Sequence, residues 1–235
     1  MSQGDLPQLS IVVPTLNEAA KLGDLLADLE GVQQTYQVIV VDGGSTDGTP
    51  SVARDSGAQV LCTAPGRGLQ LRAGADAATA SLICFLHADA RLDAEAVETL
   101  SALALRRPAG AFAFRLRIAD DRARYRLVEL GALLRSRYLR LPYGDQGLIV
   151  HRRDSLRAGG YPPQPLMEDV ALVRALRKVT EIRVLDADIR VSARRWQRDG
   201  VLLRTVRNQV LLLRYLCGAR PDRLAGAYRP ETPHE

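Results

Sequence analysis

Short apolar runs alternate with amphipathic stretches along the first half of the chain. The apolar runs predict four strands, at residues 9–13, 38–41, 60–62 and 82–86. The stretches that follow them predict four helices, at residues 17–29, 49–56, 69–78 and 93–106. Strand–helix units in succession indicate an α/β fold, with a Rossmann-like, mostly parallel central sheet flanked by helices.

The pattern becomes less regular after residue 110. We expect strands at residues 111–118 and 182–191, and a loop that enters a strand within residues 144–151. The expected helices are at residues 122–137, 167–179 and 201–215. No linker or repeat interrupts the chain, so residues 1–235 are predicted to form a single domain with two halves, about 9–106 and about 107–229.

Composition and charge narrow the class of protein. Hydrophobic residues make up 46% and charged residues 25%, which is typical of a globular protein. The chain shows neither a long uncharged apolar run nor a secretory signal at its start, so we expect a cytoplasmic protein. Its net charge of +5 is uneven, because residues 174–229 hold 14 basic and 5 acidic side chains, net +9.

This basic region suits a phosphate, an anionic membrane or a nucleic acid. The expected helix at 201–215 interleaves three arginines with apolar residues, at Leu202, Leu203, Val206, Val210 and Leu213. Such a helix either lies on the inner face of a membrane as a peripheral contact or packs on the sheet. Few aromatic residues accompany the arginines, so no nucleic acid is expected as a partner.

Polar residues gather where the first strands end, at residues 14–18, 42–47 and 87–89. In an open α/β sheet these ends share one edge, where ligands bind. Asp42 follows an apolar strand directly, and its carboxylate must therefore cap a turn or face a ligand. The first turn lacks the glycines of a dinucleotide fingerprint, and no Gly-x-x-x-x-Gly-Lys loop occurs, so a nucleotide would be held by side chains and a metal.

Four segments of the first half carry a family resemblance. They read Val-Val-Pro-Thr-Leu-Asn-Glu at 12–18, Val-Asp-Gly-Gly-Ser-Thr-Asp-Gly-Thr at 41–49, Gly-Arg-Gly at 66–68 and Leu-His-Ala-Asp at 86–89. Their order and spacing resemble the inverting glycosyltransferases of family 2, which have the GT-A fold. Later segments, at residues 144–147, 159–162, 167–169 and 192–196, are similar to the acceptor-side motifs of that family. The combination looks most like a small bacterial subgroup of radical-SAM and selenodomain-associated transferases, some linked to arsenosugar biosynthesis.

The resemblance implies a metal-dependent, inverting transfer of a sugar from a UDP-sugar to an acceptor hydroxyl, with residues 9–106 binding the donor and residues 107–229 the acceptor. Asp89 would ligate a divalent cation, Mn²⁺ or Mg²⁺, that neutralises the leaving diphosphate. His87 stands where the family has an aspartate, and it is either a second ligand or a supporting core histidine. Asp169 would accept the proton of the attacking hydroxyl, although Glu168 and Asp169 could also cap a helix.

The other implied contacts form two groups. On the nucleotide side, Asp42 would accept the imide N–H of uracil and Arg67 would approach the nucleoside or a phosphate. Asp47 would contact ligand or cap the helix near residue 49. The full nucleotide-side set is Pro14, Thr15, Asn17, Glu18, Asp42, Asp47, Gly66, Arg67, Arg194, Arg195 and Trp196. The acceptor-side set is Gly144, Asp145, Gln146 and Glu168.

Two other functions stay open on the residues alone. A nucleotidyltransferase would share the sheet and a metal-binding aspartate, but it would usually need a glycine-rich loop at the first strand end. A peripheral-membrane glycosyltransferase would act on a lipid-linked acceptor, with the basic helix at 201–215 as its contact.

Overall fold

A computed structural model describes residues 7–30 and 35–227. Its strands are β1 (Leu9–Thr15), β2 (Tyr36–Asp42), β3 (Gln59–Cys62), β4 (Leu82–Phe85), β5 (Ala90–Leu92), β6 (Ala111–Ile118), β7 (Leu148–His151) and β8 (Ile182–Val191). Its helices are α1 (Ala19–Asp28), α2 (Thr49–Asp55), α3 (Arg67–Ala77), α4 (Ala94–Arg106), α5 (Ala123–Tyr138), the 3-10 turn η2 (Gly144–Gln146), α6 (Arg152–Arg157), α7 (Glu168–Leu176), α8 (Arg194–Asp199), α9 (Val201–Leu216) and α10 (Pro221–Ala227).

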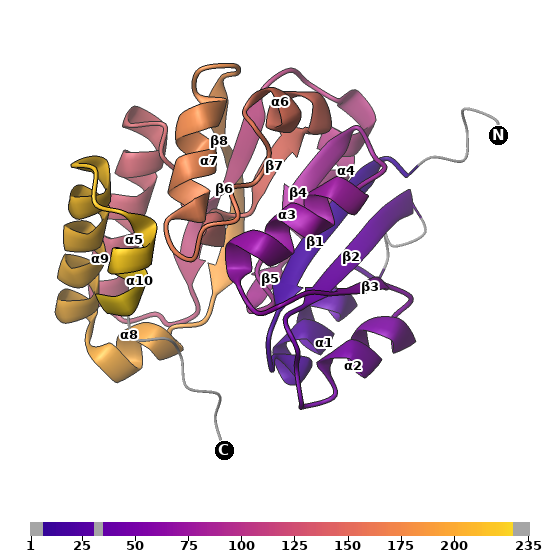
Figure 1. The fold of residues 1–235 in the computed structure, drawn as a ribbon, viewed down its shortest axis with the longest axis horizontal. Helices are drawn as coiled ribbons and strands as arrows, with labels where there is room; N and C mark the ends of the chain where they lie inside the picture. The colour runs from indigo at the N-terminus through magenta and orange to yellow at the C-terminus, as the bar shows by residue number, and fades with distance from the viewer. Residues whose placement is uncertain (1–6, 31–34, 228–235) are drawn as a thin grey trace.

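The strands form an eight-stranded sheet in the order β3-β2-β1-β4-β7-β6-β8-β5 (Figure 1). Six strands run in one direction, while β7 and β5 run antiparallel to their neighbours. In the register of β1 with β2, Thr15 lies opposite Asp42, so the polar ends of these strands meet at one edge. The expected α/β fold, with a mostly parallel sheet flanked by helices, is confirmed.

Two hydrophobic clusters cover the two faces of the sheet. Consecutive residues of β2 alternate between them: Val40 packs in the cluster with α1 and α4, and Val41 packs in the cluster with α3 and α7. Helix α3 approaches β1 closely at Gly74, where an added Cβ would lie 2.3 Å from Val12 Cγ1. This close contact fixes the distance from the sheet to the beginning of α3, which carries site residues.

Several boundaries differ from the sequence-based expectation. Helix α1 begins at Ala19 instead of residue 17, because Asn17 has φ 54° and therefore cannot continue a right-handed helix. Helix α3 begins two residues early, at Arg67, and α7 ends at Leu176. The pattern missed β5, α6, α8 and α10, which span three to seven residues and are too short to show a periodicity.

Helix α9 differs most from expectation. The five apolar residues that defined its face are all exposed, so packing of that face on the sheet was a wrong alternative. The inward side carries Arg204, Leu211 and Leu212 instead. None of the described helices combines the length and apolarity that crossing a membrane requires.

Candidate active site

The loops after β1 and β2 are joined by hydrogen bonds. Asn17 Oδ1 accepts from the Thr46 N–H at 2.8 Å, and the Asn17 N–H donates to Ser45 Oγ at 2.8 Å. Asp47 accepts from the Ala19 and Thr49 N–H groups, at 3.1 Å each, and so caps the first turns of both α1 and α2. Although burial acts to raise the pKa of Asp47, these hydrogen bonds and that of the Thr49 hydroxyl lower it. Asn17 and Asp47 therefore shape the edge of the sheet, as the capping alternative for Asp47 expected.

Asp42 is buried at the end of β2. Its Oδ2 accepts from the Gly44 and Ser45 N–H groups at 2.9 and 2.8 Å, and its Oδ1 accepts from the Ser45 and Thr15 hydroxyls. This is the turn-capping arrangement. Because a carboxylate oxygen has more than one acceptor direction, these bonds still allow a further donor to approach.

The neighbouring predicted residues lie around the same edge. Thr15 is buried, and its carbonyl oxygen accepts from Gln70 Nε2 at 2.8 Å, as does that of Val41. Pro14 is half-buried one residue earlier, and Glu18 forms an ion pair with Lys21 at 2.6 Å. Gln70 was not predicted. Its place in α3, three residues after Arg67, was the only signal.

Arg67 connects the two halves of the chain. It follows Gly66, which has φ 151°, and its Nε donates to Glu168 Oε1 across a sequence separation of 101 residues. Arg67 Nη2 also lies 4.0 Å from Asp169 Oδ2. Burial raises the pKa of Glu168, which Arg67 opposes and the Asp169 carboxylate reinforces. The sequence predicted all three residues, but it did not predict that they form one cluster.

The glycine after Arg67 explains why the cluster forms. A Cβ at Gly68 would lie 2.6 Å from the Gln164 carbonyl oxygen and 2.7 Å from that of Pro162, so the first turn of α3 rests against the backbone that leads into α7. At the start of α7, Met167 adopts a left-handed conformation with φ 60°. Such a conformation is uncommon outside glycine, and here it precedes Glu168 directly.

Asp169 is oriented by two backbone groups. The Gly144 N–H donates to its Oδ2 and the Val170 N–H to its Oδ1, both at 2.8 Å. A Cβ at Gly144 would lie 3.2 Å from both Asp169 Oδ2 and His87 Nε2, so a larger residue would crowd these two side chains. Asp169 is 9% exposed, and the exposed part faces a cavity of about 120 Å³.

This cavity is where the predicted residues of the two halves meet. Its lining includes Arg67 and His87 from the first half and Asp145, Asp169 and Trp196 from the second. The sequence analysis missed Tyr143 and three lining residues of α9, which are Arg204, Asn208 and Leu211. Tyr143 faces Arg135, whose guanidinium carbon lies 3.3 Å from the ring centroid. Arg204, Asn208 and Leu211 were missed because α9 was assigned its opposite face, whereas Tyr143 directly precedes η2.

The remaining predictions divide into structural and peripheral residues. Gln146 is fully buried, and its Oε1 accepts from Arg135, the Ser136 hydroxyl and the Tyr143 N–H. It therefore supports η2 from behind the cavity. Arg194 is exposed at the start of α8 and is not among the lining residues, and the prediction for Arg195 falls outside the described side chains.

The candidate metal ligands lie at the end of β4. His87 lines the cavity, whereas Asp89 is half-buried outside the lining. Among the described residues, no three histidine, cysteine, aspartate or glutamate side chains converge. Magnesium and similar cations are commonly held by one or two carboxylates together with substrate phosphates, so this sparse donor set fits a cation that shares a diphosphate.

Residues 10–159 match the sequence profile of Glycosyl transferase family 2. The chain belongs to this family. Family membership favours glycosyl transfer over nucleotidyl transfer for this family 2 transferase, and it agrees with the strand-end motifs.

Curated relatives match over shorter segments. An uncharacterised glycosyltransferase of Mycobacterium tuberculosis is 39% identical over 87 residues, which cover 37% of this chain and 38% of that protein. The undecaprenyl-phosphate 4-deoxy-4-formamido-L-arabinose transferase of Aeromonas hydrophila is 31% identical over 112 residues, covering 43% of this chain and 34% of that protein. The match thus spans less than half the length of either relative.

Solved structures share the fold with this family 2 transferase. Staphylococcus aureus TarS residues 1–349 superpose with a TM-score of 0.64 at 18% identity, covering 79% of this chain and 60% of that chain. The glucosyl-3-phosphoglycerate synthase of Mycobacterium tuberculosis, solved with Mn²⁺, UDP and phosphoglyceric acid, gives 0.60 at 22% identity, covering 92% and 80%. The mannosyltransferase PcManGT of Pyrobaculum calidifontis, solved with GDP-Man and Mn²⁺, superposes with a TM-score of 0.62 at 21% identity. The match covers 79% of this chain and 56% of that chain. The architecture is thus that of a GT-A glycosyltransferase.

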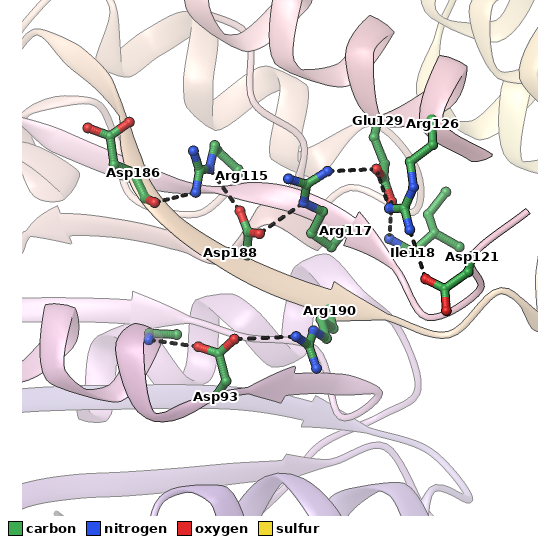
Figure 2. Close-up of polar contacts among 11 residues, drawn as sticks. Asp93, Arg115, Arg117, Ile118, Asp121, Arg126, Glu129, Asp186, Asp188 and Arg190 are labelled. Atoms are coloured by element: carbon green, nitrogen blue, oxygen red, sulfur yellow. Dashed lines mark hydrogen bonds and ion pairs between the residues drawn. The ribbon is translucent and has the colours of Figure 1, made fainter. Parts of the chain in front are cut away.

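A second hollow of this transferase lies along β6 and β8, and ion pairs fill its walls (Figure 2). Asp188 accepts from Arg115 and Arg117 at 2.8 and 2.9 Å, and Arg117 also donates to Glu129 of α5 at 3.0 Å. Glu129 accepts from Arg126 as well. These ion pairs link α5 to β6 and β8. Because the charged side chains are already paired with one another, this hollow is a weaker candidate for a ligand site than the first cavity.

Proposed function

We propose that the protein transfers a sugar from a UDP-sugar to an acceptor hydroxyl, with inversion at the anomeric carbon. The observation that carries the proposal is Asp169, a carboxylate that is oriented by two backbone N–H groups and lines the same cavity as Arg67 and His87 of the first half. A single base on the far side of the sugar from the leaving group requires a direct displacement, and hence inversion.

In this proposal the first half, about residues 9–106, binds the donor. Asp42 receives the imide N–H of uracil, with Pro14, Thr15, Asn17 and Glu18 around the base and ribose. Gly66 and Arg67 lie toward the diphosphate. The choice of uridine draws support from TarS and glucosyl-3-phosphoglycerate synthase, both of which were solved with UDP.

The second half, about residues 107–229, positions the acceptor. Asp169 accepts the proton of the attacking hydroxyl, while Glu168 holds Arg67 so that its second nitrogen remains near Asp169. Gly144 and Asp145 are proposed to border the hydroxyl, and Asp145 and Trp196 both line the cavity. Arg194 and Arg195 precede Trp196 and are proposed to approach the diphosphate.

A divalent cation, Mn²⁺ or Mg²⁺, is proposed at the end of β4. Asp89 and His87 would hold it, and the bound cation would neutralise charge on the departing diphosphate. Two structural neighbours were solved with Mn²⁺, which supports this choice.

Three finer predictions remain proposals. Likeness to the radical-SAM and selenodomain-associated subgroup rests on residues 86–89, 144–147 and 192–196. A cytoplasmic location rests on the sequence. A lipid-linked acceptor draws support from the Aeromonas hydrophila relative, whose name specifies undecaprenyl phosphate.

The donor assignment is tested by calorimetry with UDP and CDP, with Mn²⁺ or with chelator. UDP should bind more tightly than CDP, because cytosine lacks the N3 donor, and Mn²⁺ should strengthen binding. Equal affinity for the two nucleotides would remove the role of Asp42. An affinity that is the same with Mn²⁺ and with chelator would remove the metal assignment.

The catalytic assignment is tested with Asp169→Asn. Loss of a general base should lower turnover about 10²- to 10⁴-fold and leave UDP affinity unchanged. Asp76→Asn, on the exposed side of α3, is the matched control. Release of UDP identifies glycosyl transfer, whereas pyrophosphate would indicate nucleotidyl transfer. Wild-type turnover in Asp169→Asn would refute the base assignment.

A further inference from the structure

Helix α9 is turned with its apolar side to solvent. The exposed residues recur at helical spacing, and Leu202 at 78% exposure is the most exposed of them. The set is Leu202, Leu203, Val206, Val210, Leu213 and Leu216. The opposite side carries Arg204 and Asn208, which line the cavity. Surface helices of globular proteins normally bury the apolar side, so this orientation requires an explanation.

Helix α5 repeats the arrangement. Its exposed residues Leu127, Leu130, Leu134 and Tyr138 are spaced three and four apart and so form one stripe along the helix. The buried stripe on the other side includes Glu129 and Ser136. Helices α5 and α9 lie side by side, and α10 joins them at the end of the molecule away from β2 and β3 (Figure 1).

Internal polar contacts account for the inward polar sides. Glu129 accepts hydrogen bonds from Arg117 and the Ile118 N–H of β6, which anchor α5 to the sheet, and from Arg126 of α5 itself (Figure 2). Arg204 of α9 donates to Asp199 at 2.6 Å. Hydrogen bonds from Arg198 and Arg204 lower the pKa of Asp199 to about 2, so this anchor is charged at neutral pH. The outward orientation of the leucines is therefore built into the fold.

The charge of this surface indicates what covers it. Helices α5 and α9 contain seven arginines and one glutamate, and the glutamate, Glu129, is buried. Arg204 faces the cavity and pairs with Asp199, and Arg126 pairs with Glu129. The outward surface is nevertheless positive, because Arg124, Arg137 and Arg214 are exposed on it. Arg137 and Arg214 are exposed and make no ion pair with the described residues. An apolar stripe with arginines beside it matches a bilayer interface, where acyl chains take the leucines and anionic headgroups take the guanidinium groups.

We infer that the exposed apolar stripes of α5 and α9 form a docking face for an anionic lipid bilayer. A second copy of the chain fits this face less well, because two such faces in contact would oppose like charges. The inference does not rest on the proposed catalytic roles, since it concerns residues outside the cavity. Because α9 also lines the cavity from its other side, docking would place the candidate active site next to the membrane surface.

The test is co-sedimentation of the full chain with two kinds of vesicle, phosphatidylcholine alone and phosphatidylcholine with phosphatidylglycerol in equal parts. We expect sedimentation with the anionic vesicles at low salt, and a marked decrease at high salt, because headgroup attraction is screened. Equal sedimentation with both vesicles, or none with the anionic ones, would overturn the inference.

Variants on exposed positions should leave the fold intact. Leu203→Ser with Val210→Ser, and separately Arg137→Gln with Arg214→Gln, should each lower vesicle affinity about tenfold or more. Leu105→Ser with Leu156→Ser is the matched control, because these leucines are 69% and 56% exposed on other helices. Thermal melting without vesicles checks folding.

Light scattering separates the competing occupant. The inference expects a mass that does not depend on the leucines in the absence of lipid. A dimer that Leu203→Ser with Val210→Ser dissociates would assign the face to a second copy and refute the membrane assignment. Equal loss of vesicle binding in the control variant would also refute it, because the effect would then not be specific to this face.

Discussion

The ion pair between Arg67 and Glu168 leads to a quantitative prediction about stability. Glu168 is 1% exposed, and its Oε2 accepts no hydrogen bond from the described residues, so Arg67 is the main compensation for its charge. Breaking a fully buried ion pair costs about 3–5 kcal/mol. Solvent weakens this pair, because the Arg67 side chain is 36% exposed. We therefore expect Arg67→Met to lower the free energy of unfolding by about 2 kcal/mol at neutral pH. For a domain of this length, that corresponds to a decrease in Tm of about 4–8 °C.

The sign of the pH dependence follows from the raised pKa of Glu168. Burial raises this pKa in the folded protein, so the folded state holds the proton more tightly than the unfolded chain does. The contribution of Glu168 therefore favours folding below its unfolded pKa and is lost as the pH rises through its folded pKa. The positive charge and hydrogen bond of Arg67 lower the pKa of Glu168, so this pKa should rise further in Arg67→Met. The destabilisation by Arg67→Met should thus be smallest in acid, where Glu168 is protonated, and should grow toward neutral pH.

The assay is urea unfolding of the wild type and the variants at about pH 5 and about pH 7, with the double variant Arg67→Met, Glu168→Gln alongside. A neutral amide needs no cation, so the double variant should regain more than half of the loss at neutral pH. Arg72→Met on the same helix is the control; its exposed pair with Asp76 should matter by less than about 0.5 kcal/mol. A double variant no more stable than Arg67→Met, or a loss that does not change with pH, would refute this account.

Three further predictions concern the edge of the sheet and the helices beside it. Asp47→Ala should lower the free energy of unfolding by about 1–2 kcal/mol, because the first turns of α1 and α2 each lose a cap. The pKa of Asp47 is lowered in the folded protein, so in denaturant titrations the difference between variant and wild type should vanish as the pH falls below that pKa. Gly74→Ala should lower the free energy of unfolding by about 1–3 kcal/mol, because the added methyl group would overlap Val12. Gly131→Ala, in open space on α5, should instead raise it by about 1 kcal/mol. Equal Tm values for these two variants would contradict the packing argument. Gly68→Ala should displace the backbone before α7 and lower transfer activity more than UDP affinity, and a variant with wild-type turnover would show that this contact is not required.

The strand–helix alternation was sufficient to predict β1 to β4 and α1 to α4, because β1, β2 and β4 are mainly apolar runs and α1 and α4 each bury an apolar stripe. The three-residue strand β5 gave no such pattern. The same reasoning failed for α9. Its pattern identifies an amphipathic helix, but periodicity alone does not state which side faces inward. Arg204 faces inward because Asp199 and the cavity receive it, and Asp199 was not connected with α9 in the sequence analysis.

The candidate site shows a similar division. The strand-end position of Asp42 predicted its place at the edge of the sheet, and the cap expected of Asp47 is present. The contact between Arg67 and Glu168 could not be predicted, since 101 residues separate them and the contact depends on how α3 and α7 pack. Asp89 shows the converse. Its motif predicts a metal ligand, but the lining of the cavity includes His87 and not Asp89.

The position of Arg67 has a consequence for how the two halves work together. Arg67 belongs to the half proposed to bind the donor, yet its hydrogen-bond partner Glu168 and its near neighbour Asp169 belong to the half proposed to bind the acceptor. Because Gly68 presses α3 against the backbone that precedes α7, a shift of the donor-side helix moves the guanidinium group relative to the proposed base. A diphosphate that attracted Arg67 would compete with Glu168 for the donors of Arg67. Because Glu168 Oε2 has no hydrogen-bond partner among the described residues, Glu168 would then need a proton or a new cation. On the proposed function, donor binding and the charge beside Asp169 would therefore be coupled through one side chain.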